Sequence, residues 1–164
     1  MTYSVNLSSM FVHQIPGTIV PKQNTAGRVS PILRTNKLNT VRTNLYVTVD
    51  ITEMASGKIE FDDGTSLLTS TNFISLDMKY QSGTLTFTKT SGDNTYDGMD
   101  AHLGALFIYG VNEITTATLK FVDTSKADIA LNVSYNSDDM MASVTWDVTK
   151  NDVTFLEVSQ VVFA

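Results

Sequence analysis

Residues 43–52 read TNLYVTVDIT, and the period of two in this stretch is the strongest structural signal in the chain. Leu45, Val47, Val49 and Ile51 occupy alternate positions, with Tyr, Thr and Asp between them. Successive side chains of a β-strand point to opposite faces, so this alternation predicts a strand with one buried face. We expect the four aliphatic residues to point into the interior of a sheet.

The same period recurs in later segments that are separated by short polar connections. The segments are NFISLDMKY, TLTFTKT, EITTATLKF, DIALNVSY, MASVTWDV and VTFLEVSQVVFA. Their connections, QSG, VDTSKA and TKND, predict hairpins, as does the Asp-Gly step within residues 62–64. Trp146 lies on the apolar side of MASVTWDV and is expected in the core. Residues 97–109 allow either a short helix or a strand, because helical apolar spacing competes there with the run LFIY.

We therefore predict an all-β fold of eight or nine strands. It should be an antiparallel β-sandwich of jelly-roll type or a barrel, preceded by an extended N-terminal arm. We place the arm at residues 1–40 and the antiparallel β domain at residues 41–164.

Charge and proline content distinguish the arm from the β domain. The first 49 residues hold five of the eleven basic residues and none of the seventeen acidic ones. All three prolines, Pro16, Pro21 and Pro31, fall in the same region. Proline restricts its own φ and the preceding residue and cannot donate a hydrogen bond, so the pattern predicts a strap without regular structure.

The excess of basic residues in the arm predicts that it contacts an acidic protein surface. Its charges are too dispersed for a dedicated nucleic-acid arm, and seventeen carboxylates would repel a polyanion, so nucleic acid is not the expected partner. In an extended strap the arginines share one side and apolar residues the other. We predict that the following residues form a subunit interface: Lys22, Arg28, Val29, Leu33, Arg34, Lys37 and Arg42. Docking of the arm on its own sheet is the alternative.

The sequence holds no recognisable catalytic motif. There is no cysteine, the only histidines are His13 and His102, and HExxH, GxSxG and GxGxxG are absent. We expect no enzymatic activity and no cofactor. Calcium at Asp93, Asp97 and Asp100 is the one metal alternative to an ordinary solvated loop, although the match to an EF-hand loop fails at its twelfth position.

A β domain behind a basic arm, without cysteine, catalytic motif, secretion signal or membrane span, resembles the build of virion structural proteins. Capsid, head-decoration and tail components of bacteriophages belong to this class. The resemblance implies a non-enzymatic subunit of a virion that forms homo-oligomers or binds other virion proteins and contacts no membrane. Outside a virion, the chain is expected to be soluble. The alternative is a ligand- or glycan-binding β-sandwich, with exposed tyrosines stacking on sugars; its candidates are Tyr80, Tyr96, Tyr109 and Tyr135.

Overall fold

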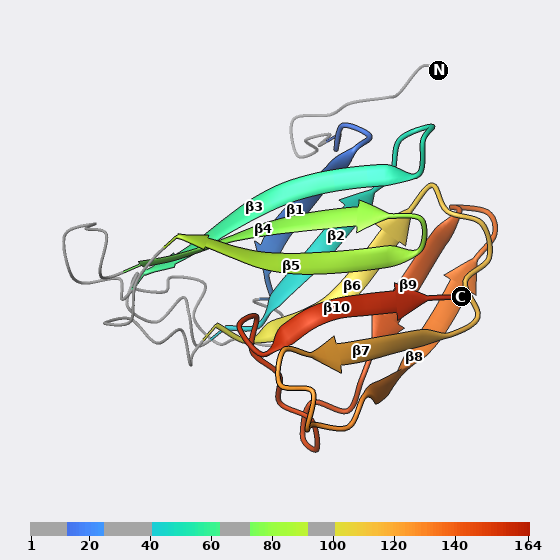
Figure 1. Ribbon diagram of the computed structural model, residues 1–164. Helices are drawn as coiled ribbons and strands as arrows, with labels where there is room; N and C mark the ends of the chain where they lie inside the picture. The colour runs from blue at the N-terminus through green and yellow to red at the C-terminus, as the bar shows by residue number, and fades with distance from the viewer. Residues whose placement is uncertain (1–12, 25–40, 63–72, 92–100) are drawn as a thin grey trace, which may run out of the picture.

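The strands of the described residues form a single closed sheet (Figure 1). The computed structural model describes residues 13–24, 41–62, 73–91 and 101–164. Within these ranges there is no helix, and the all-β prediction is confirmed. The ten strands are β1 (Thr18–Gln23), β2 (Thr43–Thr48), β3 (Met54–Asp62), β4 (Phe73–Gln81), β5 (Thr84–Ser91), β6 (Leu103–Tyr109), β7 (Ala117–Phe121), β8 (Ile129–Asn136), β9 (Met141–Thr145) and β10 (Val158–Phe163).

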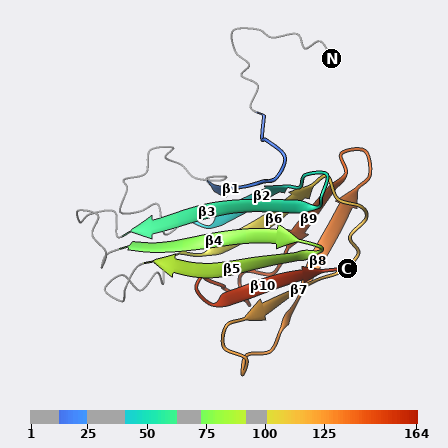
Figure 2. The same ribbon diagram turned by 45° about the horizontal axis from the view of Figure 1, so that its top comes forward.

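The order of strands around the barrel is β1-β2-β6-β9-β8-β7-β10-β5-β4-β3 (Figures 1 and 2). Two contacts in this ring are parallel, β1 with β3 and β2 with β6, and the others are antiparallel. The barrel alternative is therefore the correct one, whereas a purely antiparallel sandwich or jelly roll is wrong. β1 and β2 form an antiparallel pair that closes the ring between β3 and β6. β1 runs parallel to β3, and β2 runs parallel to β6. Alternation along one strand carries no information about such long-range neighbours.

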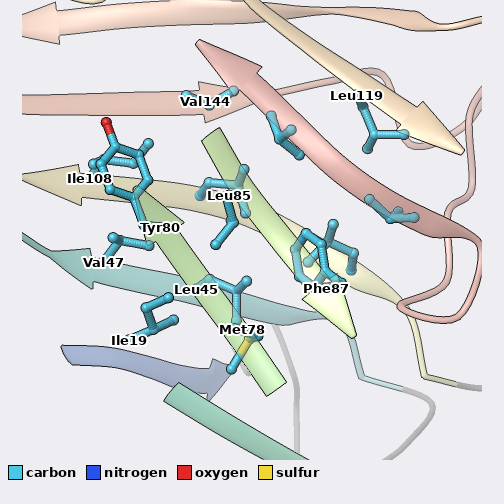
Figure 3. Packing of buried hydrophobic residues seen from close by; sticks show 14 of the residues in the cluster. Ile19, Leu45, Val47, Met78, Tyr80, Leu85, Phe87, Ile108, Leu119 and Val144 are labelled. Carbon is cyan, nitrogen blue, oxygen red and sulfur yellow. The ribbon is translucent and has the colours of Figure 1, made fainter. Parts of the chain in front are cut away.

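Alternate apolar side chains fill the interior of the barrel (Figure 3). Leu45, Val47 and Val49 are buried as predicted, and so is Trp146. Ile51 is fully exposed, so its predicted burial is wrong, because the strand ends at Thr48 and Ile51 lies in the following turn. Each aliphatic side chain removed from water contributes about 1.5–3 kcal/mol, which makes this interior the main source of stability.

The described part of the predicted arm contains a barrel strand, β1, so the expectation that this part lacks regular structure is wrong. β1 pairs with β2, with Pro21 opposite Leu45. Asn24 N donates to Arg42 O at 2.8 Å, so residues 24 and 42 form a hydrogen-bonded pair of the β1–β2 ladder. Hydrogen-bonded and non-hydrogen-bonded pairs alternate along an antiparallel ladder, and Pro21 with Leu45 is therefore a non-hydrogen-bonded pair. The N–H that proline lacks is therefore not needed for pairing with β2. The remainder of the arm, residues 1–12 and 25–40, lies outside the described residues.

The predicted hairpins have mixed outcomes. β4 and β5 pair across Ser82 and Gly83, whose φ values of 47° and 73° are those of a two-residue type I′ turn. β7 and β8 pair as expected, and the run LFIY belongs to strand β6 rather than a helix. The hairpin across TKND is wrong: β9 pairs with β6 and β8, and β10 with β5 and β7. The Asp-Gly step at residues 63–64 lies outside the described residues.

The strand directions sort the connections into two ends of the barrel. One end, here called the acidic end, comprises residues 13–17, 49–53, 82–83, 110–116 and 137–140, at the upper right of Figure 1. The other, here called the Trp146 end, comprises residues 122–128 and 146–157. The residues that flank the three internal undescribed stretches also lie at the Trp146 end: Asn24 and Val41, Asp62 and Phe73, Ser91 and Ala101.

Candidate functional site

Arg42, His102 and Asp152 form a charged cluster at the Trp146 end. Arg42 Nη2 lies 2.9 Å from Asp152 Oδ1, and Arg42 Nη1 donates to the carbonyl oxygen of Leu103 at 3.3 Å. His102 Nδ1 lies 3.0 Å from the same Asp152 oxygen, but the pair lacks hydrogen-bond geometry and leaves this buried nitrogen without a hydrogen-bond partner. Because Asp152 is half exposed, its ion pair with Arg42 contributes at most about 1 kcal/mol.

A hollow of about 200 Å³ lies beside this cluster. Asn44 Oδ1 accepts a hydrogen bond from Ala105 N at 2.9 Å, at the point where the β2–β6 register shifts. Gly104 leaves room for the Asn44 side chain, because a Cβ on residue 104 would overlap Asn44 Oδ1. Trp146 donates its Nε1–H to Asn151 O at 3.1 Å and is only 8% exposed, so its ring offers no stacking surface. The hollow is smaller than the usual small-molecule pocket of about 300–1,000 Å³. Its lining is Asn24, Arg42, Asn44, Gly104, Ala105, Thr145, Trp146 and Val148.

Two residues of the predicted subunit interface are described, and both contact their own chain. Lys22 Nζ lies 5.8 Å from the centre of the Tyr46 ring, a cation–π contact between β1 and β2. Arg42 is held by Asp152 as described above. The five others, Arg28, Val29, Leu33, Arg34 and Lys37, lie outside the described residues, and their role in an interface stays a prediction.

The predicted calcium ligands Asp93, Asp97 and Asp100 lie outside the described residues. Within the described ranges, no group of three or more His, Asp or Glu side chains is placed to hold a metal ion. No helix there is long and apolar enough to cross a membrane.

The structure describes three of the four predicted tyrosine platforms, and the prediction for Tyr80 is wrong. Tyr80 is 4% exposed, inside the barrel, and burial raises its pKa. Tyr135 packs against the core and donates its hydroxyl to Val111 O at 3.0 Å. Tyr109 is partly exposed on β6, and burial also raises its pKa. Tyr96 lies outside the described residues.

An aromatic pair on the outer wall was not among the residues predicted from the sequence. Tyr46 on β2 and Phe107 on β6 are register partners, and their rings stack with centres 4.9 Å apart. Val20 on β1, opposite Tyr46, is 44% exposed. The signal was present in the alternation itself, since Tyr46 lies between two inward residues of TNLYVTVDIT and must therefore face outward.

The acidic end carries exposed apolar side chains. Ile15 is 74% exposed, Ile51 fully exposed and Met140 46% exposed. Backbone hydrogen bonds place their loops side by side: Gly17 N donates to Thr48 O at 2.7 Å, Val49 N to Tyr109 O at 3.1 Å, and Gly110 N to Met140 O at 2.9 Å. Together with Val20 on the adjoining wall, these residues make up what we call the apolar patch: Ile15, Val20, Ile51 and Met140.

The loops of this end contain carboxylates and neither lysine nor arginine. The Asp50 carboxylate accepts from the Thr52 hydroxyl at 2.6 Å and from the amides of Thr52 and Met54, and these hydrogen bonds lower its pKa. The salt bridges found within the described ranges lie elsewhere, on β3 and at the Trp146 end. The five carboxylates of this end form no salt bridge with a lysine or arginine of the described ranges. They are Asp50, Glu53, Glu113, Asp138 and Asp139.

Comparison with known proteins yields a fold likeness and no family. No family model and no curated protein sequence matches the chain. Among solved structures, it is similar to an ER glucosidase II complex of catalytic subunit and regulatory-subunit binding domain, with TM-score 0.66, 15% identity and 91% of this chain covered. A glucosidase II α subunit bound to Glc1Man2 gives TM-score 0.65 at 15% identity, again over 91% of this chain.

An α-1,4-glucan lyase from Gracilariopsis lemaneiformis is a more distant match, with TM-score 0.51, 12% identity and 77% of this chain covered. The chain spans only about one sixth of each glucosidase chain, 17%, and 14% of the lyase chain. At these identities the likeness shows a shared β fold. It carries no activity from those enzymes to this chain.

Proposed function

We propose that the protein is a non-enzymatic structural subunit that assembles with other copies of itself or with partner proteins. The observation that carries the proposal is the apolar patch. Four of the five large apolar side chains that are exposed among the described residues belong to it, and the fifth, Val122, lies at the Trp146 end. Three of the four lie on loops that backbone hydrogen bonds hold side by side, and exposed apolar residues that gather at one end of a domain are typical of an interaction site.

The proposed assembly is a virion, with the chain as a capsid, head-decoration or tail component. The support is architectural: a closed β barrel with a filled interior, an apolar outer patch and a basic N-terminal region. Among the described residues, Arg42 is paired with Asp152, and the hollow that Arg42 lines is smaller than a usual ligand pocket. This arrangement suits a protein whose function is binding through its outer surface.

The test compares single substitutions at the two ends of the barrel. Ile51→Asp places a charge in the apolar patch, and Val122→Asp is the matched control because Val122 is also well exposed, at 62%. By mass photometry and sedimentation velocity, the wild-type chain and Val122→Asp should form oligomers at micromolar concentration, whereas Ile51→Asp should dissociate. A monomeric wild-type chain would refute the proposal, as would equal oligomer formation by Ile51→Asp.

A glycan-binding module is the second candidate, favoured by two observations. The similar structures are glucosidases and a glucan lyase, and the stacked pair Tyr46–Phe107 lies on the outer wall, where aromatic faces can stack on sugars. A glycan array would detect such binding. Tyr46→Ala should abolish it while Tyr135→Phe, a change at a core-facing ring, should not. An array without a positive signal would remove this candidate.

A further inference from the structure

We propose that a hollow at the acidic end of the barrel binds a protonated alkylamine, with the alkyl chain against its apolar wall and the ammonium group between Glu53 and Glu113. The inference goes beyond the proposed function, because the ligand is a small organic cation and the site is a pocket. Three features of the molecule support it: the shape and lining of the hollow, two carboxylates without a salt bridge, and the hydroxyl group of a buried tyrosine.

The hollow has a volume of about 190 Å³. Four parts of the chain line it: the β2–β3 turn, the β4–β5 hairpin, the β6–β7 connection and the end of β10. It therefore lies at the mouth of the barrel, which is a common place for a ligand site. Thr116 N donates to Ala164 O, and Phe163 N donates to Gly83 O, both at 2.8 Å. These backbone hydrogen bonds hold the walls of the hollow in place.

The size of the hollow suits one slender chain. A molecule of liquid water occupies about 30 Å³, so the volume of the hollow corresponds to about six non-hydrogen atoms. This is too little for a drug-sized ligand but enough for an amine on a short alkyl chain. The apolar wall consists of four buried side chains, Tyr80, Val111, Ile114 and Phe163. An alkyl chain that enters the hollow is removed from water against them.

Two carboxylates, Glu53 and Glu113, line the hollow and are exposed. Neither forms a salt bridge with another residue of the described ranges. Asp50, Asp138 and Asp139 lie at the same end and add to the negative potential that attracts a cation. A hard metal ion takes only oxygen ligands and gains nothing from an apolar wall, whereas an ammonium group on an alkyl chain matches both the carboxylates and the wall.

Tyr80 brings a buried hydroxyl group to the hollow. Its side chain projects inward from β4 (Figure 3) and is 4% exposed, and its hydroxyl donates to no acceptor among the described residues. Burial and the Glu53 carboxylate raise the pKa of Tyr80, and the Gly83 amide opposes them, so the hydroxyl is protonated at neutral pH. A phenolic oxygen has two lone pairs and can accept a hydrogen bond from an ammonium group. Buried polar groups usually have such a partner.

Titration of the full chain followed by heteronuclear NMR tests the inference. n-Pentylamine, which is protonated at neutral pH, should bind saturably and shift the backbone amide signals of Gly83, Asn112 and Glu113, which line the hollow. 1-Pentanol lacks the charge and pentanoate carries the opposite one, so both should bind at least about tenfold more weakly. Nα-Acetyl-lysine methylamide carries the same ammonium group on a peptide unit. Tighter binding of this compound than of pentylamine would identify the ligand as a lysine side chain of a protein, and weaker binding would identify it as a free amine.

Substitutions then locate the binding energy. Glu53→Gln and Glu113→Gln should each weaken pentylamine binding about tenfold, because each removes a charge beside the ammonium group. Tyr80→Phe keeps the ring and should weaken binding about threefold to fivefold through the loss of the hydroxyl. Asp138→Asn is the matched control: it removes the same charge from the same end outside the hollow, and binding should stay within about twofold of the wild-type value. Circular dichroism should show that all variants are folded.

Three results would overturn the inference. Pentylamine could fail to shift the amides of the hollow, or 1-pentanol could bind as tightly as pentylamine. Asp138→Asn could also weaken binding as much as Glu113→Gln, which would assign the attraction to the whole acidic end. None of these results concerns oligomer formation, so each would leave the proposed function intact.

Discussion

Gly57→Ala tests whether residues 18–23 belong to the wall of their own barrel. β1 approaches β3 so closely at this point that a Cβ on Gly57 would overlap the carbonyl oxygen of Ile19 and come within 2.8 Å of the Ile19 Cβ. Both are backbone or backbone-attached atoms, and neither can rotate away. The alanine methyl group must therefore push β1 off β3.

The magnitude follows from the contacts that β1 would lose. Displacing β1 breaks the hydrogen bond from Ser56 N to Gly17 O, 3.0 Å, with a net cost of about 1 kcal/mol. It also exposes Ile19, now 4% exposed, whose burial contributes about 1.5–3 kcal/mol. Alanine offsets about 0.5–1 kcal/mol by restricting the unfolded chain. We expect a net loss of about 2–3 kcal/mol in the free energy of unfolding, or about 5–10 °C in Tm for a chain of this length.

Urea unfolding followed by the fluorescence of the single tryptophan, Trp146, and thermal unfolding followed by circular dichroism would measure this loss. Ser56→Ala is the matched control, because Ser56 is the neighbouring residue and its side chain faces solvent; its effect should stay within about 0.5 kcal/mol. If Gly57→Ala is as stable as the control, β1 does not pack against β3. The barrel would then be open at this position, and residues 18–23 would be available to a partner.

Two further substitutions probe other parts of the barrel. Asn44→Ala removes the acceptor of the Ala105 amide at the β2–β6 irregularity and should lower the free energy of unfolding in urea by about 1–2 kcal/mol. Asn44→Asp keeps the acceptor and should lower it less. Equal losses in the two variants would contradict the role assigned to Asn44. The contribution of Glu157 to stability should depend on pH. Burial raises the pKa of its carboxyl group, but hydrogen bonds from Lys126 and Thr154 outweigh burial and hold the pKa below its ordinary value. A lowered folded-state pKa means that Glu157 stabilises the fold above its unfolded-state pKa, about 4.3. It loses this effect as the pH falls from there through the lower folded-state pKa. The stability advantage of the wild-type chain over Glu157→Gln should therefore be present at about pH 7 and shrink by about pH 3; a constant difference would contradict this role.

The candidate site shows where local patterns were informative and where they were not. Alternation correctly placed Leu45, Val47 and Val49 inside, and the same alternation implies that Tyr46 faces outward, although Tyr46 was not among the predicted tyrosine platforms. Arg42 was assigned to an intermolecular contact because the chain from residue 1 to 49 lacks carboxylates. Its partner, Asp152, lies 110 residues later in the sequence and meets it only when β2 and the β9–β10 connection converge at one end of the barrel.

From the sequence alone came the all-β class, the inward faces of the individual strands and the concentration of basic charge near the N-terminus, because alternation, propensity and charge are properties of neighbouring residues. The tertiary structure alone decided the closed ring with its two parallel contacts, the inclusion of residues 18–23 in the wall, and the separation of the acidic end from the Trp146 end. These features depend on which distant strands pair and in which direction. That choice is made by burial of the shared interior and by backbone hydrogen bonding across the whole chain, and no local pattern encodes it.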